Sequence, residues 1–140
     1  MGRLLGLDYG SKRVGVAETD DLQIIASPLI TIHSQDIVNF ILDYSKKFDL
    51  DAVIVGTPKN LDLSDTHATK MVDQFTKHLR KKINPIEVIL QDERFTSKIA
   101  LQSMITGGVK KSKRREKGVL DKVSASIILQ SYLEKRSKGF

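Results

Sequence analysis

The stretch GLDYGSKRVGVA (residues 6–17) joins two short apolar runs through a polar turn. The first run, residues 3–8, ends in an acid, and the second, residues 13–17, is rich in β-branched side chains. The turn between them contains a glycine, so the pattern is typical of a β-hairpin. A third apolar run at residues 28–32 predicts another strand, with Pro28 at its first position. We therefore expect the chain to open with an antiparallel meander.

Working outward from this hairpin, the pattern changes at Ser34, a suitable N-cap for a helix with apolar residues at helical spacing up to Phe48. Strands are expected at 51–56 and 86–90, with helices at about 65–79, 96–106 and 118–134. The core-facing residues expected on the last helix are Leu120, Val123, Ile127, Ile128 and Leu133. Alternating strands and helices give parallel pairs with right-handed crossovers. The sequence thus predicts an α/β fold: a five-stranded mixed sheet, antiparallel in its first three strands and then parallel, flanked by about four helices.

Length and composition indicate one soluble domain spanning residues 1–140. The chain has 140 residues, of which 40% are hydrophobic and 29% charged, and it contains no cysteine. Disulfides and thiolate metal sites are therefore excluded. The apolar start of the chain is interrupted by Asp8 and is too short for a signal peptide or a membrane span. We expect a cytoplasmic protein with no membrane partner.

Three acids are expected to meet at one edge of this sheet. Asp8 closes the first strand, Glu93 follows the fifth, and Asp121 lies in the first turn of the last helix. Ligands of open α/β sheets gather at the carboxyl ends of the strands. Clustered carboxylates repel one another unless a cation lies between them, and their hard oxygens suit Mg²⁺ or Mn²⁺. Two such ions about 3.5–4 Å apart can support phosphodiester hydrolysis.

Each acid also has a structural explanation that the sequence leaves open. Asp8 could be an ordinary turn residue, and Asp121 could favour the helix dipole. Glu93 could belong to a solvated charge cluster with its neighbours. Their combination at one sheet edge favours the catalytic hypothesis.

Four ordered motifs resemble a known family. They are GLDYGSKRVGVA (6–17), VGTPKN (55–60), DERFTS (92–97) and LDKVSASIILQSYL (120–133). Together they resemble the YqgF/RuvX family, bacterial proteins described as Holliday junction resolvases or pre-16S rRNA nucleases. The resemblance implies an RNase H-like fold in which Asp8, Glu93 and Asp121 take the three catalytic, metal-binding acid positions.

A net charge of +6 raises the expectation of a nucleic-acid partner, and its distribution is informative. Six of the eight residues 110–117 (KKSKRREK) are lysine or arginine. They lie within a segment, 107–118, that is expected to be a mobile loop. A solvated loop without a ligand is the alternative. The residues expected to bind nucleic acid are Lys12, Arg13, Lys59, Asn60, Arg94, Lys110, Lys111, Lys113, Arg114, Arg115 and Lys117. Of these, Lys12 and Arg13 could equally belong to an exposed turn, and Arg94 could pair with a neighbouring acid.

The expected function is a metal-dependent nuclease using Mg²⁺ or Mn²⁺. RNA is favoured over a DNA junction as the partner. The resemblance implies precursor 16S rRNA, in a ribosome precursor, as the substrate and processing of its 5′ end as the reaction. A Holliday junction resolvase is the first alternative, although the sequence shows no obvious dimer surface, so we expect a monomer or weak homodimer. A non-catalytic nucleic-acid-binding module is the second. A nucleotide-binding domain of the actin or sugar-kinase type is a third, but it requires two such domains.

Overall fold

The computed structural model describes residues 2–57, 67–92 and 117–137. Its strands form one five-stranded sheet in the order β3-β2-β1-β4-β5. The strands are β1 (Arg3–Tyr9), β2 (Arg13–Thr19), β3 (Ala26–His33), β4 (Leu50–Thr57) and β5 (Glu87–Asp92). The helices within the described residues are η1 (Ser34–Asp36), α1 (Ile37–Lys47), α2 (His67–Ile83) and α5 (Lys117–Ser137). The helix predicted at 96–106 lies outside the described residues.

The strand directions confirm the predicted mixed sheet. β2 pairs antiparallel with both β1 and β3, whereas β4 pairs parallel with β1 and with β5. The carboxyl ends of β1, β4 and β5 therefore lie at the same edge of the sheet. β1 and β4 are central neighbours, as the placement of the acids requires.

Pro28 does not begin β3, which starts two residues earlier, at Ala26. The pairing register shifts here, because Val16 pairs with Ile30 and the next residue, Ala17, pairs with Pro28. β3 is also an edge strand. A bulge on an edge strand tolerates a proline, which has no N–H to donate to a ladder.

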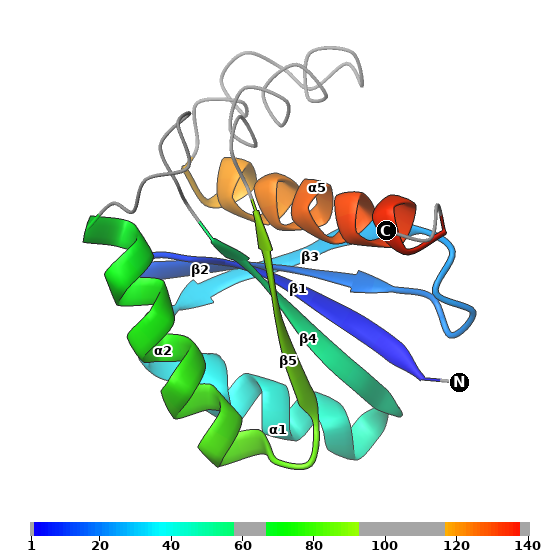
Figure 1. Ribbon diagram of the computed structural model, residues 1–140, viewed down its shortest axis with the longest axis horizontal. Helices are drawn as coiled ribbons and strands as arrows, with labels where there is room; N and C mark the ends of the chain where they lie inside the picture. Colours follow the sequence, from blue (N-terminus) through cyan, green and yellow to red (C-terminus); the bar gives the residue numbers. More distant parts are fainter. Residues whose placement is uncertain (1, 58–66, 93–116, 138–140) are drawn as a thin grey trace.

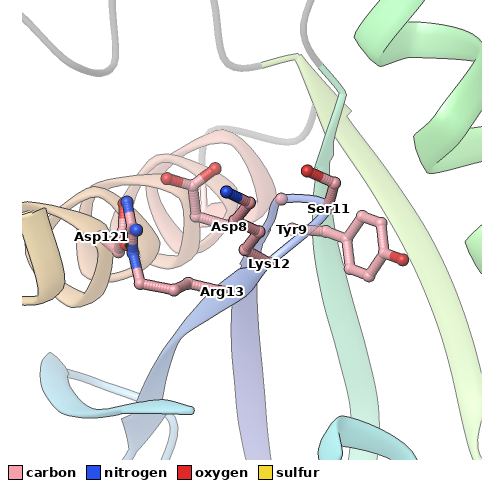
Figure 2. A pocket seen from close by; sticks show the side chains of 7 residues that line it. Asp8, Tyr9, Ser11, Lys12, Arg13 and Asp121 are labelled. Carbon is pink, nitrogen blue, oxygen red and sulfur yellow. Dashed lines mark hydrogen bonds and ion pairs between the residues drawn. The ribbon is translucent and has the colours of Figure 1, made fainter. Parts of the chain in front are cut away.

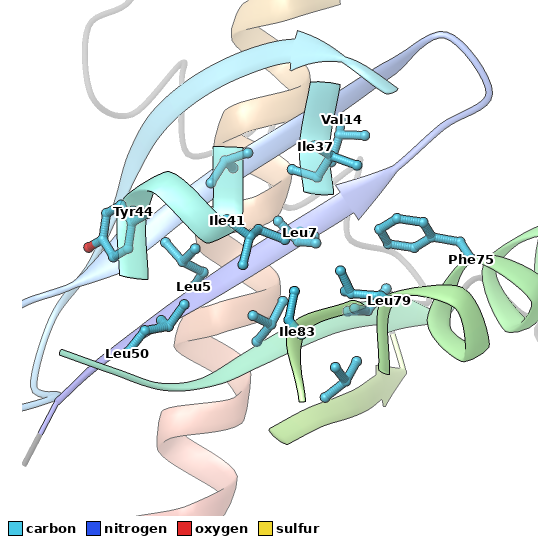
Figure 3. Packing of buried hydrophobic residues seen from close by; sticks show 14 of the residues in the cluster. Leu5, Leu7, Val14, Ile37, Ile41, Tyr44, Leu50, Phe75, Leu79 and Ile83 are labelled. Atoms are coloured by element: carbon cyan, nitrogen blue, oxygen red, sulfur yellow. The ribbon is translucent and has the colours of Figure 1, made fainter. Parts of the chain in front are cut away.

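Helices cover both faces of the sheet: α1 and α2 lie on one face and α5 on the other (Figure 1). Side chains alternate between these faces along each strand. On β1, Leu5 and Leu7 join the cluster that packs against α1 and α2, while Leu4 joins the cluster on the α5 side. Figure 3 shows the larger cluster, in which Ile37 and Ile41 of α1 and Leu79 and Ile83 of α2 meet the sheet. None of the described helices combines the length and the apolar composition needed to cross a bilayer.

The start of the first helical segment differs from the prediction that Ser34 is its N-cap. Ser34 is instead the first residue of η1, and the ring nitrogen Nδ1 of His33 accepts from the backbone N–H of Gln35. At the other end, Phe48 is 38% exposed, whereas Tyr44 is buried. Burial of the polar end of Tyr44 is compensated, because its hydroxyl donates to Glu18 on β2, 2.8 Å away.

α5 also packs with a different face from the one predicted. Ile128 and Leu133 are buried as expected, but Leu120, Val123 and Ile127 are only partly buried. The most buried positions are instead Ser124, Ala125, Ile128 and Leu129. A Cβ at Gly6 would lie 2.8 Å from Leu129 Cβ and 2.9 Å from the carbonyl oxygen of Ala125. Glycine on β1 and small side chains on α5 thus allow a close helix–sheet contact.

Candidate active site at the carboxyl edge of the sheet

Asp8 lies near the end of β1, on the α5 side of the sheet. Its neighbours Leu7 and Tyr9 belong to the opposite face, and the ring of Tyr9 stacks on Phe75 of α2 with 4.0 Å between centroids. Alternation along the strand therefore directs the carboxylate of Asp8 toward α5. Figure 2 shows Asp8 and the ring of Tyr9 on opposite sides of the strand.

The turn after Asp8 is held in place by hydrogen bonds. The backbone N–H of Gly10 donates to the carbonyl of Arg13, 2.9 Å away. Ser34 fastens the same turn from outside, because its N–H donates to the carbonyl of Lys12 (3.0 Å) and its hydroxyl to that of Ser11 (2.7 Å). The side chains of Lys12 and Arg13 therefore extend from a backbone that is fixed beside Asp8.

Gly15 brings the third acid close to the first. Gly15 is the cross-strand partner of Asp8 in the β1–β2 pair. The first turns of α5 lie so close above it that a Cβ at this position would overlap the backbone carbonyl of Asp121. Only glycine permits this approach. Asp8 and Asp121 are far apart in the sequence, but the backbones of both lie against Gly15.

Arg13 forms an ion pair with Asp121 within this site. Its Nε donates to Asp121 Oδ2 at 2.7 Å, and the side chains are 42% and 21% exposed respectively. The sequence predicts Arg13 as a phosphate contact, and the structure adds a carboxylate partner that the sequence does not indicate. Since the two residues are 108 positions apart, no local pattern could have revealed the pair.

These side chains surround one cleft. It has a volume of about 290 Å³ and is lined by Asp8, Tyr9, Gly10, Ser11, Lys12, Arg13 and Asp121. Figure 2 shows the two carboxylates entering it from β1 and from α5. Among these lining residues the formal charges balance, with two acids against two bases. The cleft offers hard oxygen ligands next to cationic groups, the combination required to hold a divalent ion and a phosphate together.

Glu93 lies just outside the described residues. β5 ends at Asp92, whose cross-strand partner is Thr57, so the chain leaves β5 at the edge where Asp8 lies. Within the described residues, no group of three acids or histidines converges to hold a metal ion. Asp8 and Asp121 nevertheless supply the oxygen donors that Mg²⁺ or Mn²⁺ prefers, and the donor set fits such an ion.

Most of the residues predicted to bind nucleic acid also fall outside the described residues. They are Lys59, Asn60, Arg94, Lys110, Lys111, Lys113, Arg114 and Arg115, together with the side chain of Lys117. The backbone of Lys117 begins α5. Of the predicted set, the structure brings Lys12 and Arg13 to the cleft.

The burial of Thr57 is a feature of this edge that the sequence pattern does not indicate. Thr57 ends β4, is 6% exposed, and its hydroxyl finds no hydrogen-bond partner in the described structure. Buried hydroxyls are usually paired, because an unpaired one loses its hydration without compensation. Its neighbours along β4, Val53 and Val55, belong to the cluster packed against α1 and α2. Alternation therefore places Thr57 on that face of the sheet, opposite Asp8.

Solved structures support the fold assignment. The RuvC protein of Thermus thermophilus superposes with a TM-score of 0.56 at 14% sequence identity, covering 97% of this chain and 96% of that one. Its complex with a Holliday junction gives a TM-score of 0.55 at 16% identity, covering 96% and 95%. At this identity the likeness concerns the fold, which is RNase H-like, as the sequence resemblance implied.

Sequence comparisons identify the family. A protein of Christiangramia forsetii is 47% identical over 133 residues, covering 95% of this chain and 98% of its own. One of Phocaeicola vulgatus is 47% identical over 136 residues, covering 97% and 98%. Both carry the name "Putative pre-16S rRNA nuclease". The family model described as "RuvX: Holliday junction resolvase" matches residues 2–135. The chain belongs to the RuvX family of nucleases.

Proposed function

We propose that this protein is a metal-dependent nuclease that hydrolyses phosphodiester bonds at the cleft between β1 and α5. The observation that carries this proposal is the placement of Asp8 and Asp121 on one cleft at the carboxyl edge of the sheet. β5 ends at this edge with Asp92, and Glu93, the next residue in the sequence, would supply the third carboxylate. Family membership supports hydrolysis of an ester bond in nucleic acid.

The three acids would hold Mg²⁺ or Mn²⁺, with two ions present when substrate is bound. Such ions activate a water molecule and neutralise charge on the leaving oxygen. The protein itself would fix the carboxylates in place, through the short β1–β2 turn and the contact of α5 with Gly15. Fixed ligands matter because Mg²⁺ demands a near-ideal coordination geometry.

The cations of the chain would bind the substrate backbone. Lys12 and Arg13 line the cleft, where a phosphate would lie next to the metal-binding acids. Residues 110–117 would contact further phosphates along the strand, as would Lys59, Asn60 and Arg94. Contacts with phosphates recognise the charge and shape of the nucleic acid and do not distinguish its base sequence. The substrate would therefore be selected by its structure.

Precursor 16S rRNA is the substrate we favour, with processing of its 5′ end as the reaction, in the cytoplasm and on a ribosome precursor. The names of the curated relatives support this choice. The family description supports the alternative, a DNA junction. A resolvase cuts two opposed strands and so requires two sites related by a two-fold axis. We propose instead that the protein acts as a monomer or a weak dimer.

A cleavage assay with three substrates tests the proposal. Precursor 16S rRNA, a four-way DNA junction and a linear duplex would each be incubated with Mg²⁺, Mn²⁺ or EDTA. We expect cleavage of the rRNA with either metal and none in EDTA. Asp8→Asn should abolish it while RNA binding persists, and Asp43→Asn, at an exposed acid of α1, should leave it unchanged. Metal-independent binding that is indifferent to Asp8→Asn would instead identify a non-catalytic binding module.

A further inference from the structure

Arg13 occupies one of the two carboxylates on which the proposed metal site depends. The guanidinium bonds Asp121 Oδ2 from Nε at 2.7 Å, and the carboxylate is the less exposed partner. A carboxylate oxygen that accepts a short charged hydrogen bond is a poorer ligand for a cation, because the two positive groups repel. Arg13 and a divalent ion are therefore competitors for Asp121.

The ion pair leaves part of the Arg13 side chain available. Within the described residues, Arg13 donates to Asp121 through Nε alone, and its side chain is 42% exposed. A guanidinium has five N–H donors in a planar fork that matches two phosphate oxygens. Arg13 also lines the cleft in which a phosphate would lie. Arg13 can thus exchange a carboxylate for a phosphate without leaving the site.

We propose that Arg13 couples nucleic-acid binding to metal binding by moving from Asp121 to a substrate phosphate. In the free protein Arg13 holds Asp121 and weakens the binding of a divalent ion. When a phosphodiester accepts the hydrogen bonds of the guanidinium, the carboxylate of Asp121 is released and the affinity of the site for the ion rises. By linkage, the ion raises the affinity for nucleic acid by the same factor. This inference rests on the proposed function, and it makes Arg13 a positioning residue that acts through Asp121.

The coupling has a chemical benefit for a nuclease. A site fully loaded with metal in the absence of substrate would hold its carboxylates in the metal-bound arrangement at all times. With Arg13 on Asp121, the complete site forms more readily when a phosphate is present in the cleft. Metal would therefore be recruited together with the bond that is to be cut.

The affinity of the free protein for Mn²⁺ tests the competition, measured by electron paramagnetic resonance without nucleic acid. Arg13→Gln removes the competitor and should bind Mn²⁺ about fivefold more tightly, the value of a favourable exposed ion pair. Lys12→Gln is the matched control, because it removes the same charge from the same cleft without an ion pair to Asp121 among the described contacts. Its effect on the affinity should be smaller than that of Arg13→Gln, because it reports only the loss of a positive charge from the cleft. Equal effects of the two variants, or weaker binding by Arg13→Gln, would overturn the proposal.

A second measurement follows the guanidinium directly. The Nε–H signal of Arg13 would be recorded by NMR in EDTA, where the proposed reaction does not proceed, before and after adding a short RNA duplex. We expect a shift on RNA addition, and an unchanged signal would contradict the exchange. Failure of the proposed function appears differently, since Mn²⁺ would then bind wild type and Asp8→Asn alike. If Mn²⁺ binding depends on Asp8 but not on Arg13, the nuclease proposal survives and the coupling does not.

Discussion

The backbone carbonyl of Asp121 lies directly on Gly15, the cross-strand partner of Asp8. This contact holds the last helix, α5, against β2, the strand that pairs with the one carrying Asp8. It sets how closely the two carboxylates can approach, and hence whether both can bind one ion. The geometry of the site therefore depends on a residue with no side chain.

Replacing Gly15 with alanine tests this link. The added methyl overlaps backbone, which cannot rotate away, so α5 must shift from β2. Overpacking of this kind typically costs about 1–3 kcal/mol of folding stability. We expect Gly15→Ala to remain folded by circular dichroism, to melt at a lower temperature and to lose more than about tenfold in Mg²⁺-dependent cleavage.

Gly118→Ala on α5 is the matched control for this substitution. A Cβ there would lie 3.8 Å from Thr31 Cβ, an ordinary contact. Cleavage by Gly118→Ala should remain close to that of wild type. If Gly15→Ala cleaves as well as Gly118→Ala, the approach of Asp121 to β2 is not needed for the reaction.

The segment 110–117 should account for much of the salt dependence of nucleic-acid binding. Replacing its six lysines and arginines with glutamine should weaken RNA binding and flatten the plot of log affinity against log salt concentration. The slope should fall by about 0.7–0.9 for each phosphate that the variant no longer neutralises. Fluorescence anisotropy at several salt concentrations measures this. The double variant Lys46→Gln, Lys47→Gln, at exposed positions ending α1, should leave the slope unchanged.

Thr57→Val should stabilise the protein. The hydroxyl of Thr57 is buried without a partner in the described structure, and such a group costs about 1–3 kcal/mol. Valine has nearly the same shape, and we expect a gain of about 1 kcal/mol in urea unfolding. Thr76→Val is the control, because the Thr76 hydroxyl, also buried, donates to the carbonyl of Val72 at 2.8 Å. A loss of stability in Thr57→Val would mean that its hydroxyl is paired in solution.

Asp20 should make the β2–β3 turn sensitive to acid. The N–H groups of Ile25 and Ile24 donate to its carboxylate, and these bonds lower the pKa of Asp20 below its ordinary value. Its contribution to stability is therefore fully present above the unfolded-state pKa and is lost as the pH falls through the folded-state pKa. The difference in unfolding free energy between wild type and Asp20→Ala should be constant near neutral pH and shrink below about pH 4. A difference that persists unchanged in acid would show that the charge plays no part.

The sequence predicted the sheet and the position of Asp8 correctly, because both follow from strong local patterns. Alternating runs identify strands, and a strand that ends in an acid places that acid at an edge. The orientation of α5 could not be predicted in this way. Apolar side chains such as Val123 and Ile127 occur on more than one side of this helix, so periodicity alone does not select the buried face.

What selects the buried face of α5 is the shape of the sheet beneath it. Gly6 and Gly15 open a path for close approach, and the residues that fit there are the small Ser124 and Ala125 beside Leu129. This choice depends on two elements separated by about a hundred residues in sequence. The ion pair between Arg13 and Asp121 could not be predicted for the same reason.

Paramagnetic NMR with Mn²⁺ tests most directly whether the acids bind a shared ion. Substoichiometric Mn²⁺ would be added to the ¹⁵N-labelled protein, because the ion broadens the signals of nearby amides first. We predict selective broadening at Asp8, Gly15 and Asp121 that Mg²⁺ reverses and that Asp8→Asn, Glu93→Gln and Asp121→Asn each reduce. Broadening confined to other parts of the chain, or unchanged in all three variants, would contradict the account.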